Sequence, residues 1–203
     1  MKFIAVSQRV DYVKARHEVR DSLDRRLSLF LHYAGYFAIP VPNSIGSLEK
    51  PSLTAELNLF MSKLKPAAVL LSGGNDPGIE RDRDIVEMAL LDFSEQHNLP
   101  VLGICRGMQM MAIRTGMELN AVEGHTNCRQ RITGEICGEV NSFHNYAVPS
   151  CPDDYHVLAT ALDGCIKAIR HNSLPWEGWM WHPEREEKFS EDDIDRLKGL
   201  VTQ

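Results

Sequence analysis

Strand-like and helix-like segments alternate over the first 116 residues of this 203-residue chain. The strand-like segments are short apolar runs at residues 3–6, 36–41, 67–71 and 101–104. Apolar residues at helical spacing follow each run, in residues 22–34, 52–64, 83–97 and 106–115. Such alternation requires right-handed crossovers and produces a parallel sheet. We therefore expect one domain over residues 1–203 with an α/β fold, a flavodoxin-like parallel sheet with helices on both faces.

Three details of these segments carry specific expectations. Ser22 is expected to cap the first helix, and Ser52 to open the second. The third helix is expected to present its apolar face through Ile85, Met88 and Phe93. The charged stretch 8–20 has no clear period, so we expect a loop on the side where ligands approach.

The texture changes after residue 116. Short runs rich in β-branched or alternating residues follow, at 117–122, 139–143, 156–162, 165–171 and 178–181. These runs predict a small antiparallel β extension rather than further strand–helix units. Ser190 then begins an acidic cap for a last helix.

Composition narrows the classes of protein that the chain can represent. It is 43% hydrophobic and 25% charged, as in ordinary globular proteins. A net charge of −6 without a basic stretch argues against a nucleic-acid partner, and no apolar run approaches the ~20 residues of a membrane span. The five cysteines show no Cys-x-x-Cys spacing, which is typical of reduced thiols. We expect a cytoplasmic protein with no membrane partner.

Cys105 lies between an apolar strand and a helix, flanked two residues away by Gly103 and Gly107. A tight strand-to-helix turn needs small residues at those places, and a thiol at a helix N-terminus is favoured as thiolate. A lone cysteine here would more often be a small buried hydrophobe. The two glycines favour a nucleophile. A cysteine phosphatase is disfavoured because it needs an arginine six residues later, where Met111 stands.

A second candidate is His182-Pro183-Glu184, at the end of an apolar run. Pro183 favours an extended conformation for His182, and residues i and i+2 of an extended segment share a face. A carboxylate beside an imidazole fixes its tautomer and stabilises the imidazolium, as a Cys–His pair requires. Taken alone, the pattern is more typical of a surface pair.

A third candidate is Ser72-Gly73-Gly74, after the third apolar run. The two glycines can simply make a turn. Alternatively, their N–H groups face Cys105 and stabilise an oxyanion, since both segments lie at the carboxyl ends of parallel strands.

The remaining chemical side chains support less. His125 and Cys128 resemble metal ligands, but no second pair has zinc-like spacing, so we expect neither a metal nor another cofactor. We expect Trp176, Trp179 and Trp181 to pack in the core and the extension.

Two segments together resemble the class I glutamine amidotransferase superfamily. They are Gly103-Ile104-Cys105-Arg106-Gly107-Met108-Gln109 and His182-Pro183-Glu184, with support from Leu71-Ser72-Gly73-Gly74-Asn75-Asp76-Pro77 and Val140-Asn141-Ser142-Phe143-His144. Within the superfamily the chain looks most like the stand-alone γ-glutamyl hydrolase branch.

The resemblance implies a Cys-dependent hydrolysis of a γ-glutamyl amide through a glutamyl thioester. It assigns the catalytic triad to Cys105, His182 and Glu184, and the oxyanion hole to the backbone of Gly74 and Arg106. The residues implied to bind the glutamyl unit are Gly73, Gln109, Asn141, Ser142, Phe143 and His144.

The leaving-group side departs from the branch, because Asn145-Tyr146 stands where relatives often carry His-Gln. Among specialised members the chain looks most like the γ-glutamyl-CDP-amidate hydrolases of capsule biosynthesis. Phosphates of such a substrate could be met by Arg106, Arg129 or Arg131.

Other readings remain open. The chain could be a glutaminase subunit that delivers ammonia to a separate synthase partner, or a γ-glutamyl-γ-aminobutyrate-type hydrolase. From other classes, it could be a catalytically silent binding protein of the same fold, or a redox protein using the same thiol. A small-molecule γ-glutamyl compound is the expected partner in the enzymatic readings.

Overall fold

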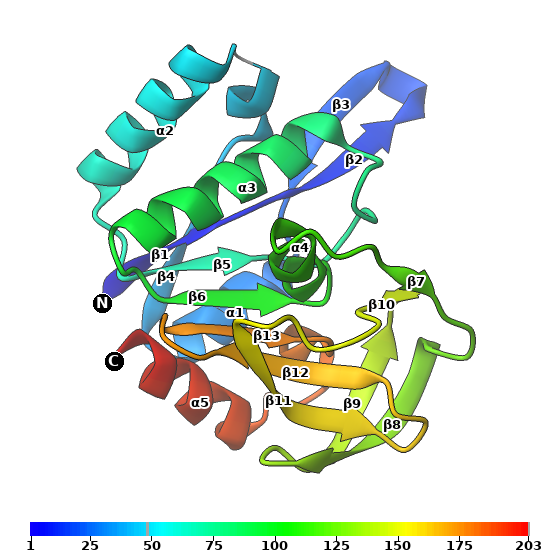
Figure 1. Cartoon of the computed structure of the whole chain (residues 1–203). Coiled ribbons are helices and arrows are strands. Elements are labelled where there is room, and N and C mark those ends of the chain that lie inside the picture. Colours follow the sequence, from blue (N-terminus) through cyan, green and yellow to red (C-terminus); the bar gives the residue numbers. More distant parts are fainter. Residues whose placement is uncertain (48, 203) are drawn as a thin grey trace.

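The computed structural model describes residues 1–47 and 49–202, which build a mixed sheet of nine strands covered by helices (Figure 1). The strand order is β4-β1-β5-β6-β13-β12-β11-β8-β9. In chain order the strands are β1 (Lys2–Val6), β4 (Tyr36–Pro40), β5 (Ala68–Leu71), β6 (Val101–Ile104), β8 (Thr126–Gly134), β9 (Gly138–Phe143), β11 (Tyr155–Ala161), β12 (Ile166–His171) and β13 (Trp176–Trp179). Strands β4 to β13 of this order are parallel, and β13 to β9 are antiparallel.

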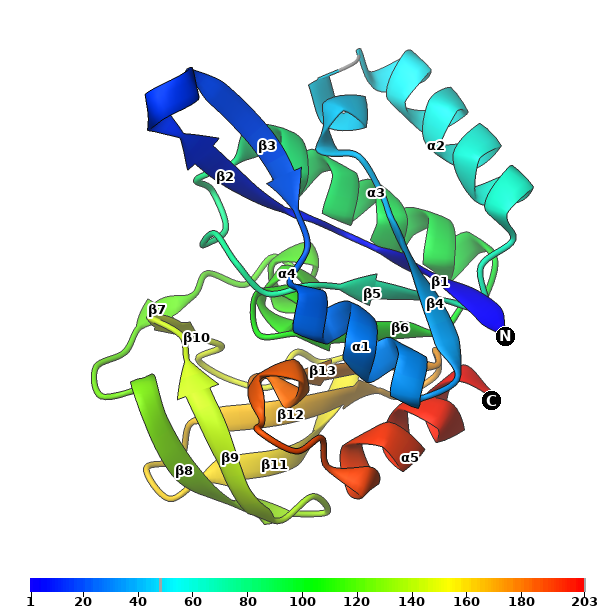
Figure 2. The same cartoon turned by 180° about the vertical axis from the view of Figure 1, so that it is seen from behind.

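Helices cover both faces of the parallel half, which confirms the predicted α/β class. Their bounds are α1 (Arg25–Tyr33), α2 (Lys50–Leu64), α3 (Arg81–Gln96), α4 (Arg106–Arg114) and α5 (Glu191–Val201). Helices α3 and α4 lie in front of the sheet in Figure 1, whereas α1 and α5 lie in front in the reverse view of Figure 2. α2 packs beside α3. Among the described residues, no helix is both long and apolar enough to cross a membrane.

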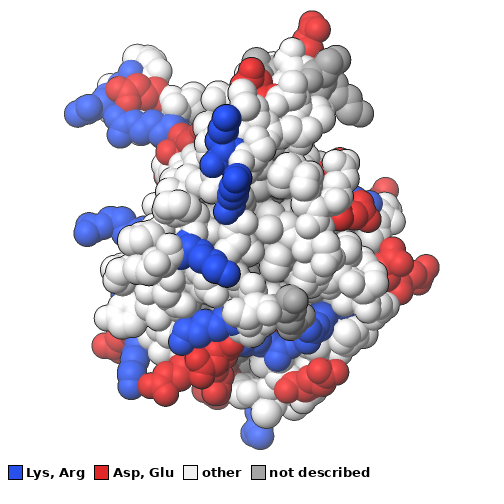
Figure 3. Space-filling view, turned by 90° about the vertical axis from the view of Figure 1, so that its left-hand side faces the viewer, with Lys and Arg blue, Asp and Glu red and all other residues white. Residues whose placement is uncertain are grey.

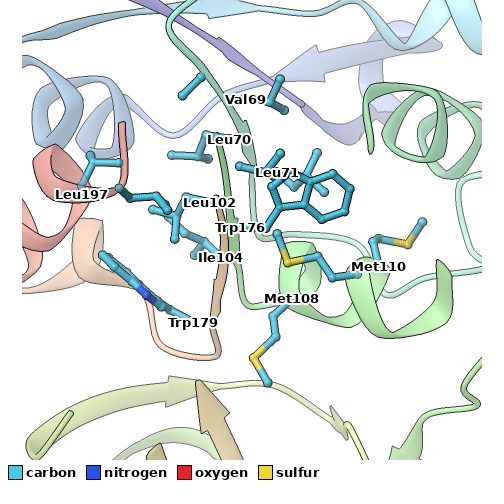
Figure 4. Close-up of a cluster of buried hydrophobic side chains, with 14 of the residues drawn as sticks. Val69, Leu70, Leu71, Leu102, Ile104, Met108, Met110, Trp176, Trp179 and Leu197 are labelled. Atoms are coloured by element: carbon cyan, nitrogen blue, oxygen red, sulfur yellow. The ribbon is translucent and has the colours of Figure 1, made fainter. Parts of the chain in front are cut away.

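The core lies between the central strands and the helices on either side (Figure 4). Every residue of β5 and β6 is buried, because strands covered on both faces have no solvent side. Met108 of α4 packs so closely on β13 that a Cβ at Gly178 would lie 2.7 Å from its Cγ. Leu197 reaches the same core from α5 on the opposite face.

The stretch expected as a loop forms a β-hairpin. Strands β2 (Arg9–Val13) and β3 (Glu18–Ser22) pair antiparallel around a short 3-10 turn, η1 (Lys14–Arg16), which ends at His17 with φ of 53°. The hairpin continues from β1 and projects past the carboxyl ends of the sheet (Figure 1). Most of its side chains are exposed or only half-buried, so no hydrophobic alternation marked the strands.

The extension is also arranged differently from the prediction. Strand β13 pairs parallel with β6 and antiparallel with β12, so it is the fifth strand of the parallel half, although residues 178–181 were expected in the antiparallel part. Strand β8 was not predicted, because its residues are mostly exposed and one of its inward positions, Gln130, is polar. The run 117–122 contains only the two-residue strand β7 (Asn120–Ala121), paired with β10 (Tyr146–Ala147).

Two helices begin at residues other than the predicted ones. Asp24, not Ser22, caps α1 by accepting a bond from the Arg26 amide, because Ser22 still belongs to β3. The second helix begins two residues before Ser52. The predicted cap is confirmed at Ser190, whose hydroxyl accepts from the Asp193 amide.

The buried face of α3 only partly matches the predicted one. Phe93 is buried as predicted, whereas Ile85 and Met88 are half-buried. The face also contains the apolar Val86, Leu90 and Leu91 and the charged pair Arg83 and Glu87. The two charged residues made this buried face hard to predict, because the buried face of a helix is recognised in a sequence by its apolar residues.

The face at the amino ends of the parallel strands carries both signs of charge (Figure 3). Basic and acidic side chains are interspersed there among uncharged residues. Ligands of parallel sheets bind at the opposite edge, outside the carboxyl ends of the strands.

Candidate active site

Cys105 occupies a strained turn between β6 and α4. Its φ and ψ are 51° and −100°, a conformation that non-glycine residues rarely adopt. The Cys105 amide donates to the carbonyl oxygen of Trp179 on β13, at 2.6 Å. A Cβ at Gly103 would lie 2.6 Å from the Gly107 carbonyl carbon, and one at Gly107 would overlap the Leu71 carbonyl oxygen. The turn thus has the close approach that the two glycines predicted.

His182 and Glu184 form a buried pair beside this turn. Nδ1 of His182 lies 2.6 Å from Oε1 of Glu184, and since a carboxylate only accepts, Nδ1 carries the proton. The side chains are 2% and 5% exposed, so the pair is not a surface pair. His182 is extended as predicted, but residues 183–185 continue as a 3-10 turn, η3 (Pro183–Arg185), and this turn brings the carboxylate to the ring.

The environment of His182 favours its charged form. Burial acts to lower its pKa, but the Glu184 charge and hydrogen bonds with Cys105 and Glu184 outweigh burial and raise the pKa to about 9. The imidazole is therefore linked to the sulfur on one side and the carboxylate on the other.

The loop after β5 packs against the imidazole. A Cβ at Gly73 would overlap Cε1 of His182, so only glycine lets the loop approach this closely. Gly74 has φ of 134°, where a side chain would be strained. Strands β5, β6 and β13 are neighbours, and all three candidate segments follow their carboxyl ends.

The backbone amide and the side chain of Arg106 lie in different surroundings. Its amide lies in the first turn of α4, directly after Cys105. The guanidinium is 1% exposed and makes ion pairs with Glu87 and Asp84. This side chain is buried and paired through both of its Nη atoms inside the protein, which removes Arg106 from the arginines expected to meet substrate phosphates.

Asn141 and Phe143 lie against the histidine. Nδ2 of Asn141 donates to the His182 carbonyl at 2.7 Å, and its Oδ1 accepts from the His182 amide at 2.9 Å, so one side chain holds both backbone groups. The Phe143 ring meets the imidazole edge-on at 5.9 Å between centroids. The Arg185 guanidinium lies over the other part of that ring, 4.6 Å from its centroid.

Gln109, Ser142 and His144 are buried and bonded within the protein. Gln109 Nε2 donates to the Tyr146 carbonyl at 2.8 Å, and His144 Nδ1 lies 2.9 Å from the same oxygen. The Ser142 hydroxyl donates to the His125 carbonyl. These side chains thus order the segment 141–146, whereas contacts between the segment and a glutamyl unit remain a proposal.

A buried lysine organises the same segment and was not singled out from the sequence. Lys167, 1% exposed, donates from Nζ to His144 Nε2 at 2.7 Å, His125 Nδ1 at 3.2 Å and Ser142 Oγ at 3.2 Å. Burial lowers its pKa, and burial together with the ammonium lowers the pKa of His144 to about 3. A lysine between the apolar residues at the start of strand β12 was the available signal.

This arrangement also explains a cluster with metal-ligand geometry. Donor atoms of His125, His144 and Cys165 lie within 4.8 Å of one another. The Lys167 ammonium already lies at hydrogen-bond distance from Nδ1 of His125 and Nε2 of His144, and it supplies the positive charge between the two rings. Cys128, considered as a ligand from the sequence, instead donates from Sγ to the Gly124 carbonyl.

A cysteine on a strained strand–helix turn, a buried His–Glu pair and a glycine loop form a constellation suited to acyl transfer. The family model for class-I glutamine amidotransferases matches residues 41–196, and the chain belongs to this family.

Two members of the family are similar to this chain. The chain is 30% identical to the γ-glutamyl-CDP-amidate hydrolase of Campylobacter jejuni, over 91% of this chain and 90% of the relative. It is 30% identical to a glutamine-hydrolysing GMP synthase subunit of Methanothermobacter thermautotrophicus, over 64% of this chain and 72% of the relative. A crystal structure described as a GMP synthase subunit from Thermoplasma acidophilum has the same fold, with a TM-score of 0.71 and 23% identity, covering 100% of this chain and 94% of that one.

Proposed function

We propose that this protein hydrolyses a γ-glutamyl amide bond with Cys105 as nucleophile, His182 as acid and base, and Glu184 as the group that orients the imidazole. The buried His182–Glu184 pair, with Nδ1 of His182 2.6 Å from Oε1 of Glu184 beside the strained Cys105 turn, is the observation that carries the proposal. Together these residues supply a nucleophile, a proton carrier and an orienting carboxylate.

The reaction begins when the Cys105 thiolate attacks the γ-carbonyl carbon and forms a tetrahedral oxyanion. The backbone amides of Gly74 and Arg106 stabilise this oxyanion, and each such donor contributes about 3 kcal/mol in comparable sites. The His182 imidazolium protonates the departing nitrogen, the C–N bond breaks, and a glutamyl thioester remains. Neutral His182 then takes a proton from water, which attacks the thioester, and glutamate and the thiol are released.

We propose a γ-glutamyl-CDP-amidate as the substrate, with glutamate and cytidine diphosphoramidate as products. The C. jejuni relative supports this substrate because the match covers nearly the whole of both chains. Arg185 replaces Arg106 as the cation proposed to meet the leaving-group phosphates, since its guanidinium lies over Phe143 and is 32% exposed. Both remaining arginines have a carboxylate partner, but Arg185 lies 3.8 Å from Glu184, whereas Arg129 pairs more closely with Glu186, at 3.0 Å.

The second candidate function is a glutaminase subunit that passes ammonia to a separate synthase. The GMP synthase relatives favour it, because their names describe each of them as one subunit of a glutamine-hydrolysing synthase. The hydrolase remains our choice because the coverage of the C. jejuni relative is higher.

Rates of glutamate release from glutamine, γ-glutamyl-γ-aminobutyrate and γ-glutamyl-CDP-amidate separate these functions. We expect the nucleotide amidate to have the highest kcat/KM. Glutamine as the best substrate would instead identify an amidotransferase subunit.

Replacement of Cys105 by alanine tests the mechanism itself. Cys105→Ala should abolish turnover of every substrate while leaving substrate binding, whereas Cys137→Ala, at an exposed free cysteine, should keep the wild-type rate. Normal turnover by Cys105→Ala would refute the thioester mechanism.

A further inference from the structure

We propose that Arg83, far from the reacting atoms in sequence, is the positioning residue for the oxyanion hole, a role that rests on the proposed function. Its guanidinium is wholly buried on α3, beneath the loop that follows β5. Nη2 donates to the carbonyl oxygens of Ser72 at 2.7 Å and Gly73 at 3.0 Å. Nη1 donates to Oδ1 of Asn75 at 3.2 Å, so one planar group holds three successive parts of the loop.

The bond to the Gly73 carbonyl determines the direction of the Gly74 amide. Carbonyl and N–H point in opposite directions across a trans peptide bond, and the described residues contain no cis peptide. With the Gly73 oxygen turned toward Arg83, the Gly74 N–H must point away from α3. The guanidinium is close enough that a Cβ at Gly74 would lie 2.6 Å from its Nη1.

This peptide needs such a restraint because glycine flanks it on both sides. Glycine adopts positive and negative φ with nearly equal ease, so a Gly-Gly peptide can rotate its N–H to the wrong side at little cost. An oxyanion donor is effective only when it is oriented before the charge develops.

The same network reaches the second proposed donor. Oε1 of Glu87 accepts from Arg83 Nε at 3.0 Å and from the Ser7 hydroxyl at 2.8 Å, while Oε2 pairs with the Arg106 guanidinium. Glu87 is completely buried, so two guanidinium groups share one desolvated carboxylate. Arg106 is thereby anchored through its side chain while its backbone amide serves the site.

Arg83→Lys tests this role because lysine keeps the positive charge but loses the planar fork that binds several carbonyls. We expect kcat to fall on the order of 100-fold, as when one oxyanion donor is lost, with KM within twofold of wild type. Arg114→Lys is the matched control, since Arg114 makes two ion pairs at the surface, and should keep wild-type values.

Two chemical probes distinguish positioning from a general structural defect. Iodoacetamide alkylates the Cys105 thiolate without forming an oxyanion, so its rate at the Cys105 peptide should be equal in wild type and Arg83→Lys. Glutamate γ-semialdehyde forms a tetrahedral adduct with the thiol, and its affinity should fall with kcat. Parallel loss of alkylation and turnover, or a kcat within twofold of wild type, would overturn the proposal.

Asn75→Ala provides a second variant if Arg83→Lys does not fold. It removes the acceptor of Nη1 while leaving both carbonyl bonds, and it also removes the two bonds between the Asn75 side chain and the Val10 backbone. We expect a smaller fall in kcat, about tenfold, with unchanged alkylation, and an unchanged kcat would count against the role of Arg83. If wild-type protein releases no glutamate from any γ-glutamyl amide, the proposed function fails; active wild type with an unaffected Arg83→Lys sinks the positioning role alone.

Discussion

The chemistry of a buried residue depends on its charged neighbours as well as on burial and residue type. His182 is almost fully enclosed, yet its pKa is raised to about 9, because Glu184 and Cys105 outweigh the loss of water. His144 lies in the segment 141–146, and its pKa is lowered to about 3 because burial and the Lys167 ammonium act in the same direction. Two buried histidines in one protein therefore serve opposite electrostatic purposes.

The raised pKa of His182 predicts a pH dependence of stability. A histidine that binds its proton more tightly in the folded than in the unfolded state stabilises the fold fully below about pH 6.5, and this contribution disappears as pH rises through about 9. The contribution amounts to about 3 kcal/mol. The free energy of unfolding, measured with urea at pH 6 and pH 10, should fall more steeply for wild type than for His182→Gln.

His156→Gln serves as the control, since His156 is an exposed histidine bonded to Asn172. This variant should follow the wild-type curve. Equal pH slopes for wild type and His182→Gln would contradict the assignment of a charged, carboxylate-paired imidazole.

At the scale of elements, helix α4 rests on β5 and β6 through glycine contacts. Gly103 faces the backbone of α4, and Gly107 faces the Leu71 carbonyl. The first turn of α4 can then lie directly on the strands, which places Cys105 at the edge where the loop after β5 and the histidine segment also arrive.

Gly107→Ala should therefore destabilise the protein by about 3 kcal/mol, because the added methyl group overlaps backbone that cannot move without displacing β5. Gly199→Ala is the matched helical control. Nothing lies within 4 Å of a Cβ at that position of α5, and alanine should stabilise the helix by about 0.5 kcal/mol. Urea unfolding of both variants measures the difference, and a mild effect at Gly107 would show that the two elements pack less tightly than described.

At the scale of the whole molecule, stability is distributed unevenly. The central strands are enclosed on both faces, whereas the β2–β3 hairpin projects from the sheet with mostly exposed side chains (Figure 2). Local opening is easiest where few apolar contacts are lost.

Hydrogen exchange followed by mass spectrometry should show this gradient. Amides of β5 and β6 should exchange only as fast as the whole molecule unfolds, whereas those of β2 and β3 should exchange at least 100-fold faster. Strands β8 and β9, whose residues are partly exposed, provide an intermediate reference. Equal protection of the hairpin and β5 would contradict the expected gradient.

The sequence by itself determined the class of the fold and the segments that build the candidate site. Apolar runs and helical periods suffice for the parallel half, because strands enclosed on both faces must be apolar throughout. Gly103, Cys105 and Gly107 could be read from spacing alone, since a close strand–helix approach excludes side chains.

Only the tertiary structure decided which polar side chains support that site. Arg83 and Glu87 are indistinguishable in sequence from solvent-exposed charges, and partners of both lie on distant segments. The central position of β13 likewise depends on pairing with β6, seventy residues or more away in the chain. The local sequence pattern depends on which residues of a segment are exposed to water. It carries no information on which buried polar group binds which partner, because those partners come from distant segments.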